Sequence, residues 1–369
     1  MAELFAGVMS GTSLDGVDAV VADFAPKDGK ACRTLGAAHV PFPTMLRDEL
    51  LALQQPGANE LARAGTAANM LAEFYAEAIK RALAEAKVEG AAIQAAGVHG
   101  QTLRHRPDLG ITVQLNNPAR VAEKSGMAVV ADFRSRDVAA GGQGAPLVPA
   151  FHAALFGRPD RHRVIANVGG IANITDLPTD GTVHGFDTGP GNVLSDLWCA
   201  RNRGTPFDAH GAWAATGRPN AALLDVLLAD PYFQEPPPKS THRDKFNLHW
   251  LDEKLAAARI DDEAENIQAT LIALTARTIA DAVRQYAAGA EEVLVCGGGA
   301  NNETLMKYLA RELAPRKVAT TAEEGVPVEQ VEALAFAWLA REALAGRPGN
   351  IPEVTGAKGK RVLGAIYPR

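Results

Sequence analysis

Short apolar runs alternate with polar turns at the start of the chain, a pattern typical of strands joined by tight connections. Strand-like runs of this kind cover residues 4–9, 17–24 and 31–41. The Asp15-Gly16 pair between the first two runs favours a hairpin. Two Ala- and Leu-rich stretches with helical spacing follow, at residues 44–55 and 59–85. The pattern therefore predicts a first sheet covered by helices.

Strand candidates and helix candidates continue to alternate along the rest of the chain. Further strands are expected at residues 93–98, 111–115, 127–131, 164–167, 171–176, 182–186 and 292–296. Further helices are expected at residues 119–124, 192–201, 266–285, 304–313 and 329–344. This alternation is typical of α/β folds with open sheets, in which polar residues at strand ends carry ligands.

The second half of the chain repeats the plan of the first. A strand at residues 164–167, the pair Gly169-Gly170 and a strand at residues 171–176 match the strand, glycine turn and strand of the N-terminus. Two lobes, each with one phosphate-binding hairpin, can close on a nucleotide between them. We therefore expect two domains, residues 1–145 and 146–369; a duplicated scaffold without nucleotide is the alternative.

Composition narrows the class of ligand. With 369 residues, 47% of them hydrophobic, the chain is long enough for two domains. A formal charge of −6 provides no basic surface for nucleic acid, so a small-molecule partner is expected. The three cysteines, Cys32, Cys199 and Cys296, are widely spaced, which argues against disulfides and structural zinc. No basic leader or membrane-length apolar run occurs, so a soluble, cytoplasmic protein is expected.

The stretch GFDTGPGN, residues 185–192, is the main candidate for catalysis. Asp187 is expected at the end of the strand at 182–186, where the surrounding glycines let the backbone approach a ligand closely. An ionised carboxylate in that position can act as a general base. Asp and Gly also form ordinary turns and helix caps, which is the alternative interpretation.

Other polar turns offer groups for binding phosphate and metal. In SGTSLDG, the backbone amides and the hydroxyls of Ser10, Thr12 and Ser13 suit phosphate oxygens. Asp15 or Asp18 suits a hydrated Mg²⁺ ion. The segment contains neither a P-loop nor a dinucleotide fingerprint, and a plain hairpin is the alternative.

Two further strand ends carry groups suited to a sugar. His99, Gln101 and Thr102 supply donors and acceptors for hydroxyls, although a histidine there can equally be structural. Arg134 and Arg136 suit a carboxylate or phosphate, because guanidinium binds such groups through two hydrogen bonds. Pairing of these arginines with neighbouring aspartates is the alternative.

Glycines also mark a possible nucleotide site late in the chain. Gly297, Gly298 and Gly299 follow the strand at 292–296 and leave room for an adenosine against the backbone. The irregular segment PYFQEPPPKSTHRDKFN is typical of a substrate loop, with Lys239 and Arg243 available to an anionic ligand. A solvated charged loop is the alternative for that segment.

Seven ordered motifs together resemble one known family. They are MSGTSLDGVD, VHGQT, ADFRSRD, GGQGAPLVP, NVGGIANIT, GFDTGPGN and CGGGANN. The chain resembles the anhydro-N-acetylmuramic acid kinase family over nearly its full length. The resemblance implies the fold of the acetate and sugar kinase, heat-shock chaperone and actin superfamily. That fold has two related lobes of the actin-like (ribonuclease H-like) ATPase type, with ATP in the cleft.

The resemblance also assigns roles residue by residue. Asp187 becomes the catalytic base. The first phosphate loop is Gly11, Thr12, Ser13, Leu14, Asp15, Gly16, Val17 and Asp18. The second phosphate loop and the adenosine site are Asn167, Gly169, Gly170, Gly297, Gly298 and Gly299. The sugar site is His99, Gln101, Thr102, Asp132, Arg134, Arg136 and Gln143. Asp15 is the candidate ligand for Mg²⁺.

The implied reaction couples hydrolysis to phosphorylation. Water attacks the anomeric carbon of 1,6-anhydro-N-acetylmuramic acid, the anhydro bridge opens, and O6 takes the γ-phosphoryl group of ATP. The product is N-acetylmuramic acid 6-phosphate, an intermediate of peptidoglycan recycling. Mg²⁺ and a homodimer are implied in the same way.

One segment departs from the family, and two other functions stay open. The family usually has a glycine after KST, whereas this chain reads KSTHRDKF with His242 and Asp244, which leaves the roles of Lys239 and Arg243 undecided. A kinase of the same fold acting on an ordinary open sugar is one alternative. A binding module switched by nucleotide is the other, although no segment resembling a peptide-binding domain follows the second lobe.

Overall fold

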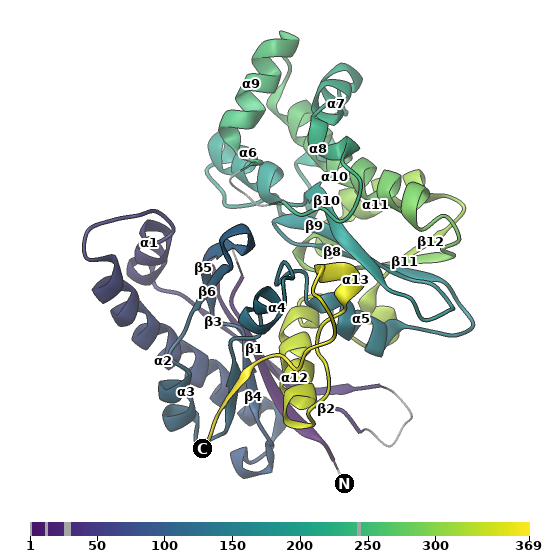
Figure 1. Ribbon diagram of the computed structural model, residues 1–369. Helices are drawn as coiled ribbons and strands as arrows, with labels where there is room; N and C mark the ends of the chain where they lie inside the picture. Colours follow the sequence, from purple (N-terminus) through teal and green to yellow (C-terminus); the bar gives the residue numbers. More distant parts are fainter. Residues whose placement is uncertain (1, 12–13, 26–30, 242–244) are drawn as a thin grey trace. The chain divides into compact units, whose positions relative to one another are not determined.

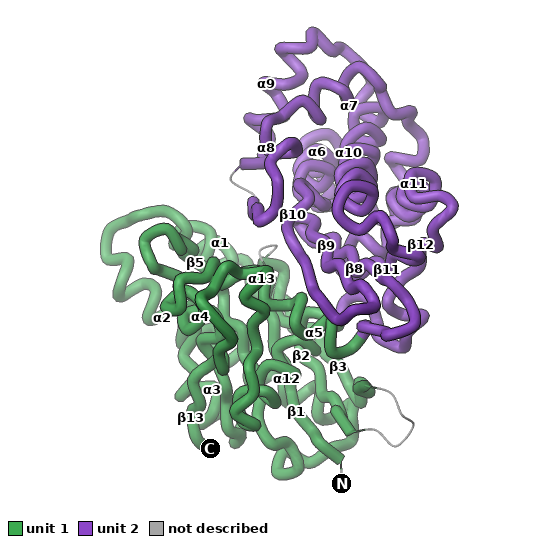
Figure 2. The backbone as a smooth tube through the Cα atoms, turned by 45° about the vertical axis from the view of Figure 1, so that its right-hand side comes forward, with its two compact units in different colours: residues 1–155, 330–369 green, residues 156–329 purple. Residues whose placement is uncertain are grey.

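The computed structural model describes residues 2–11, 14–25, 31–241 and 245–369, which form two compact units (Figures 1 and 2). Unit 1 comprises Met1–Leu155 and Gln330–Arg369, and unit 2 comprises Phe156–Glu329. The expected domain boundary after residue 145 therefore lies ten residues before the observed one, which follows Leu155. The expectation that the second domain runs to residue 369 is wrong, because the last forty or so residues return to the first sheet.

The sheet of unit 1 has six strands in the order β13-β7-β4-β1-β2-β3. Their bounds are β1 (Leu4–Met9), β2 (Gly16–Asp23), β3 (Arg33–Pro41), β4 (Ala96–Val98), β7 (Val129–Ala131) and β13 (Ala365–Tyr367). β1, β2 and β3 are antiparallel, β4 and β7 run parallel to β1, and β13 pairs antiparallel to β7. β5 (Gln101–Arg106) and β6 (Ile111–Leu115) form a separate antiparallel pair.

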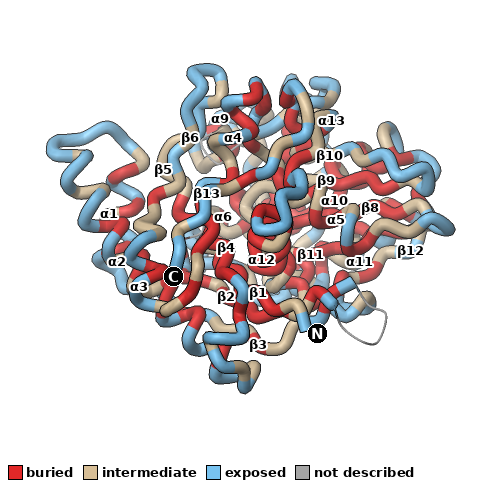
Figure 3. The backbone as a smooth tube through the Cα atoms, turned by 60° about the horizontal axis from the view of Figure 1, so that its bottom comes forward, coloured by how far each residue is buried: buried red, intermediate tan, exposed pale blue. Residues whose placement is uncertain are grey.

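Two helices lie directly on opposite faces of this sheet. A Cβ on Gly7 of β1 or Gly97 of β4 would overlap the backbone of α12 (Val331–Leu344). A Cβ on Gly36 of β3 would overlap the backbone of α2 (Glu60–Ala86). Gly7 pairs with Val20 and Gly36 pairs with Val21, and successive side chains of a strand point to opposite faces. α12 therefore covers one face, and it is buried along most of its length (Figure 3).

The other helices of unit 1 are short or peripheral. They are α1 (Thr44–Ala52), α3 (Pro118–Ser125), α4 (Ser135–Ala139), α5 (Val148–Phe156), which ends at the unit boundary, and α13 (Pro352–Thr355). The single turn η1 (Gly90–Ala92) lies between α2 and β4, and η2 (Pro107–Leu109) connects β5 to β6. Strand β5 and helices α4 and α5 were not expected from the apolar pattern.

Unit 2 repeats the strand plan of unit 1. Its sheet has the order β10-β9-β8-β11-β12. The strands are β8 (Arg163–Val168), β9 (Ile171–Leu177), β10 (His184–Pro190), β11 (Glu292–Cys296) and β12 (Lys317–Thr320). β8, β9 and β10 are antiparallel, and β11 and β12 follow parallel to β8. The internal repeat is confirmed, and it extends to the two parallel strands.

The helices of unit 2 pack around α10 and the sheet. They are α6 (Val193–Arg203), α7 (Ala221–Leu228), α8 (Pro231–Gln234), α9 (Leu248–Ala258), α10 (Ala264–Tyr286) and α11 (Glu303–Leu313). Single turns are η3 (Ala209–Gly211), η4 (Ala214–Thr216), η5 (Gly298–Asn301) and η6 (Thr321–Glu324). Ile279 and Val283 of α10 are fully buried against sheet residues such as Phe186. Among the described residues, no helix is long and apolar enough to span a membrane.

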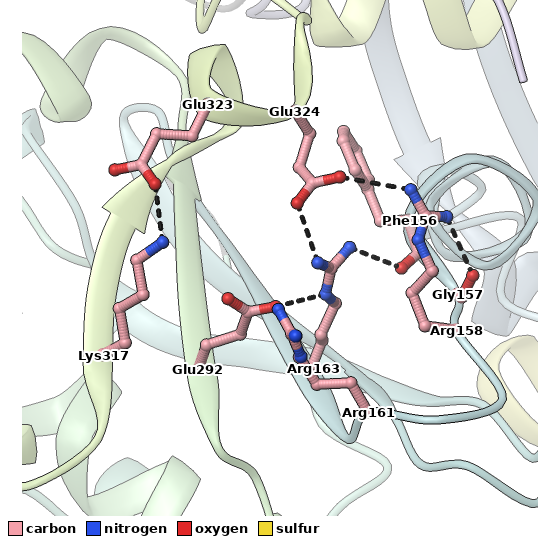
Figure 4. A network of polar contacts seen from close by, with 9 residues as sticks. All are labelled: Phe156, Gly157, Arg158, Arg161, Arg163, Glu292, Lys317, Glu323 and Glu324. Carbon is pink, nitrogen blue, oxygen red and sulfur yellow. Dashed lines mark hydrogen bonds and ion pairs between the residues drawn. The ribbon is translucent and has the colours of Figure 1, made fainter. Parts of the chain in front are cut away.

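A buried charge network holds one end of this sheet (Figure 4). Arg163 at the start of β8 pairs with Glu292 at the start of β11, and both residues are only 3% exposed. The same guanidinium donates to Glu324 at 2.7 Å and to the carbonyl oxygen of Phe156 at 3.2 Å. Phe156 and Glu324 lie close in sequence to the two points where the chain passes between the units. Arg163 therefore ties both connecting segments to the sheet of unit 2.

Candidate functional site

Asp187 lies inside strand β10, not after the end of a strand as the sequence suggested. The register between β10 and β9 shifts between Asp187 and Gly189, which marks a bulge at the carboxylate. Gly189 has φ +144°, and a Cβ there would meet the ring of Phe233 at 2.7 Å. The glycine is thus required by both backbone conformation and packing, and the bulge sets the direction of Asp187.

The two carboxylate oxygens of Asp187 differ in their hydrogen bonds to the described residues. The amide of Thr241 donates to Oδ2 at 2.9 Å, and Oδ1 accepts no hydrogen bond from any described residue. Burial raises the pKa of Asp187 to about 6, and the Thr241 N–H opposes that shift. A carboxylate with a pKa near 6 and an unoccupied oxygen has the properties of a general base at neutral pH.

The backbone of Asp187 is bound as well. Its amide donates to the carbonyl oxygen of Lys239 at 3.2 Å, and the hydroxyl of Tyr232 donates to its carbonyl oxygen at 2.6 Å. The ammonium of Lys239 points back to the carbonyl oxygen of Tyr232, 3.0 Å away. In this structure, the described part of the expected substrate loop therefore supports Asp187. His242, Arg243 and Asp244 lie outside the described residues.

The second glycine turn, between β8 and β9, is bound to the start of α6. The carbonyl oxygen of Gly169 accepts from the amide of Asn192 at 2.8 Å, and that of Gly170 accepts from Gly191 and Val193. Asn167, one residue before Val168 at the end of β8, is buried, and its Oδ1 accepts from the thiol of Cys296 at 3.7 Å. With these carbonyls engaged, the amides of the turn are the polar groups left for an anion.

The three glycines after β11 differ in their surroundings. Gly297 has φ +78°, and a Cβ there would crowd Asn167 and the backbone of Val168. A Cβ on Gly299 would overlap the side chain of Val168, whereas Gly298 has only Asn192 Nδ2 near it, at 3.8 Å. Packing against β8 therefore explains two of the glycines, and only Gly298 leaves open space.

In unit 1 the first glycine turn joins β1 to β2. Thr12 and Ser13 lie outside the described residues. Leu14 and Val17 are buried in the core, so only their backbones are available to a ligand, and the Leu14 amide already donates to Gly11 O at 3.3 Å. A Cβ on Gly16 would overlap the backbone of β3. Asp15 is exposed, and Asp18 pairs with His39 at 2.8 Å.

The expected sugar-binding residues of β4 and β5 form a buried polar cluster. His99 Nε2 accepts from Nε and Nη2 of Arg134 at 3.1 and 2.9 Å, so the imidazole is neutral with its proton on Nδ1. Burial, then the charge of Arg134, lowers the pKa of His99 well below its usual value. Gln101 donates to the carbonyl oxygen of Gly11 at 3.2 Å, and its own buried Oε1 has no described partner. Thr102 is half-buried beside it on β5.

In the segment after β7, some charged residues form buried hydrogen bonds and others are exposed. Arg134 is committed to His99 and to the carbonyl oxygen of Gly144, 2.7 Å away. Asp137 is buried and accepts from Gly144 N at 2.8 Å, which ties down the glycine-rich turn. The exposed residues of the expected set are Asp132, Arg136 and Gln143. The structure therefore brings His99 and Arg134 together and leaves Arg136 apart from that pair.

Comparison with known proteins decides the family. Residues 3–369 match the family described as anhydro-N-acetylmuramic acid kinase. The chain belongs to that family. A member from Thiobacillus denitrificans is 54% identical over 367 residues, covering 100% of this chain and 98% of the relative. A member from Bordetella petrii is 55% identical over 367 residues, covering 99% of this chain and 96% of the relative.

A solved structure shows the same fold at low identity. Component A of (R)-2-hydroxyglutaryl-CoA dehydratase from Acidaminococcus fermentans matches with a TM-score of 0.50 and 14% identity, covering 90% of this chain and 96% of that chain. At that identity the likeness shows the fold alone. The α/β prediction is confirmed: the chain has two related units of the actin-like ATPase type. As a member of the anhydro-N-acetylmuramic acid kinase family, it is a kinase.

In this kinase, sequence reasoning missed Glu332 at the start of α12. Burial raises the pKa of Glu332, and the charge of Arg134 opposes that shift. Glu332 and Arg134 are far apart in sequence and come close only because α12 returns to the sheet of unit 1. A glutamate in the first turn of a helix that is apolar up to its last turn was the available signal.

Proposed function

We propose that this protein hydrolyses the anhydro bridge of 1,6-anhydro-N-acetylmuramic acid and phosphorylates O6, giving N-acetylmuramic acid 6-phosphate and ADP. The name shared by its relatives supports the substrate class. The observation that carries the proposal is the carboxylate of Asp187, whose pKa is raised and whose Oδ1 accepts no hydrogen bond from the described residues. The reaction belongs to peptidoglycan recycling, and we expect a cytoplasmic homodimer.

Asp187 acts on water in this proposal. Oδ1 takes a proton from the water that attacks the anomeric carbon, while Oδ2 stays bound to the Thr241 amide. The carboxylate charge also stabilises the positive character that develops on the anomeric carbon. The released O6 alkoxide then attacks the γ-phosphorus of ATP. A general base of this kind contributes about 10² to 10⁴ to the rate.

ATP binding is assigned to groups in both units. In unit 2 the amides of Gly169 and Gly170 bind phosphate oxygens, Asn167 contributes its side chain, and Gly298 borders the adenosine. In unit 1 the turn from Gly11 to Asp18 binds phosphate. In unit 2 the assignment is supported by the engaged carbonyls of Gly169 and Gly170, which leave their amides for an anion, and in unit 1 it follows the family resemblance.

Mg²⁺ fits the first turn as an ion shared with the nucleotide. Within the described residues, no three His, Cys, Asp or Glu side chains form a group able to hold a metal by themselves. Mg²⁺ is commonly held by one or two carboxylates together with phosphate oxygens, and Asp15 supplies an exposed carboxylate. When bound, the ion neutralises charge on the transferring phosphoryl group.

Sugar recognition is assigned to unit 1. His99, Gln101 and Thr102 bind hydroxyl or amide groups, and Asp132 and Gln143 contribute from the segment after β7. The Arg134 guanidinium is engaged with His99 and Gly144. We therefore assign the lactyl carboxylate of the sugar to Arg136, which is exposed and has no described partner.

A comparison of two sugars tests the proposal. The purified protein, ATP and Mg²⁺ are incubated with the anhydro sugar or with reducing N-acetylmuramic acid, and ADP and sugar phosphate are measured. Turnover of the anhydro sugar with one phosphate added supports the proposal. Phosphorylation of the reducing sugar alone would contradict the proposed reaction and would favour a kinase that acts on an open sugar. ADP formation that is indifferent to both sugars would instead favour a nucleotide-switched binding module.

A further inference from the structure

The edge strand β10 needs partners at Asp187, because it is the outermost strand of its sheet. One side of β10 faces β9, and among the described residues no strand pairs with the other side. Backbone groups on such an edge stay unpaired unless another segment covers them. At Asp187 the segment containing Tyr232, Lys239 and Thr241 provides this cover.

Tyr232 is itself rigidly held. It is 2% exposed and packs edge-on against Phe233 and Phe246, with ring centroids 5.8 and 5.6 Å away. Its amide is bound by the side chain of Asp230 at 3.1 Å. The ammonium of Lys239 lies 4.7 Å from its ring centroid. A hydroxyl fixed in this way can hold the Asp187 carbonyl in one position.

Burial and two nearby carboxylates keep Tyr232 a hydrogen-bond donor. Lys239 and Lys245 also lie over its ring. Burial, then the charges of Asp187 and Glu235, raises the pKa of Tyr232. The phenol therefore stays protonated at neutral pH and donates a hydrogen bond to the main-chain oxygen of Asp187.

We propose that Tyr232 is a positioning residue for the catalytic carboxylate. Its hydroxyl fixes the backbone at the bulge, so that the Thr241 amide binds Oδ2 and Oδ1 alone is left to accept a proton. Tyr232 touches neither substrate nor reacting atoms in this role. The inference rests on the proposed function of Asp187 as base.

Tyr232→Phe removes the hydroxyl and keeps the packed ring. Loosening of β10 weakens the bond from Thr241 to Oδ2, and loss of that bond raises the pKa of Asp187 further above its usual value. We expect kcat to fall roughly tenfold while KM for ATP stays within about twofold, because misplaced reacting groups slow chemistry more than binding.

The decisive readout is the pKa of Asp187 in free protein. Carboxyl ¹³C resonances of aspartate-labelled protein are followed against pH, with Asp187→Asn identifying the relevant signal. Wild type should titrate near 6 and Tyr232→Phe distinctly higher. Tyr308→Phe is the matched control, because its hydroxyl lies on α11 of the same unit and has no described hydrogen bond. An equal Asp187 pKa in Tyr232→Phe and the control would overturn the proposal.

A second variant tests the Thr241 contact that Tyr232 is proposed to hold in place. Thr241→Pro removes the N–H donor to Oδ2, and it should raise the Asp187 pKa even if Tyr232→Phe fails to fold. An unchanged pKa in Thr241→Pro contradicts the proposal. The titration needs no sugar, so a wild type that leaves the anhydro sugar untouched defeats the proposed function while the titration still decides the role of Tyr232.

Discussion

At the residue scale, Asp187 takes its hydrogen bonds from residues far along the chain. A carboxylate among glycines in GFDTGPGN identified Asp187 as a candidate base from the sequence. The residues that bind it, Tyr232 and Thr241, lie 45 and 54 positions further along the chain. Contacts at that separation depend on how α8 and the following segment fold back onto β10, which local patterns do not encode. Glu332 escaped notice for the same reason.

The raised pKa of Asp187 predicts the pH dependence of the reaction. Burial destabilises the ionised carboxylate, so Asp187 takes up a proton as pH falls through about 6. The base is lost in that form, and kcat/KM should fall about tenfold per pH unit below 6. The measurement is a pH–rate profile for the anhydro sugar at saturating ATP. A profile flat down to pH 5 would show that an ionised Asp187 is not required.

At the element scale, apolar runs located most buried strands and long helices. The pair β5 and β6 shows where they fail: β5 reads QTLRHR, which is too polar to resemble a strand. It forms through backbone pairing with β6, while only Gln101 is buried and Leu103 packs at the margin of the core. Asp187 was placed after a strand for a related reason, since GFDTGP resembles a turn although it continues β10 through a bulge.

The glycines after β11 allow a test of packing at this scale. Gly299→Ala places a Cβ against the side chain of Val168, so it should lower the free energy of unfolding by about 1–3 kcal/mol. The Cβ added by Gly298→Ala enters open space, so this variant should change the free energy of unfolding by about 0.5 kcal/mol or less. Denaturant unfolding of both variants makes the comparison. If both are equally stable, Gly299 is not there for packing against β8.

The KM for ATP should distinguish the same variants differently, because Gly298→Ala should affect it although this variant hardly affects stability. Gly298 borders the adenosine in our proposal, so a methyl group there should raise KM for ATP several-fold while the fold stays intact. The measurement is KM for ATP at saturating sugar, with the melting temperature as control. An unaltered KM for ATP in Gly298→Ala would show that the adenosine does not bind beside this glycine.

At the scale of the whole molecule, the internal repeat was visible in the sequence but the domain boundary was not. Each glycine turn indicated where a unit begins, because a turn can be recognised from a few neighbouring residues. The return of Gln330–Arg369 to unit 1 rests on non-local contacts, namely α12 against Gly7 and Gly97 and the pairing of β13 with β7. A chain that ends at residue 329 should therefore lose amide protection in β1 while β8 and β11 keep theirs, as measured by hydrogen exchange. Full protection of β1 would contradict this division.

The charge network at the base of unit 2 gives a stability prediction at the same scale. Arg163→Met leaves buried Glu292 with only the long contact to the exposed Arg161, 3.5 Å away, so the free energy of unfolding should fall by about 3–5 kcal/mol. Lys317→Met is the control from the same region (Figure 4), because the pair Lys317–Glu323 is exposed and worth at most about 1 kcal/mol. Equal melting temperatures for the two variants would show that Arg163 does not anchor this sheet.

The central claim is that Asp187 activates water to open the anhydro ring during phosphoryl transfer. The direct test is to incubate wild type and Asp187→Asn with ATP, Mg²⁺ and 1,6-anhydro-N-acetylmuramic acid in ¹⁸O-labelled water and to read the products by mass spectrometry at early times. Wild type should yield a 6-phosphorylated sugar with one heavy oxygen at the anomeric carbon, and the variant should yield about 10²- to 10⁴-fold less. Product without heavy oxygen, or equal product from the variant, would contradict the account.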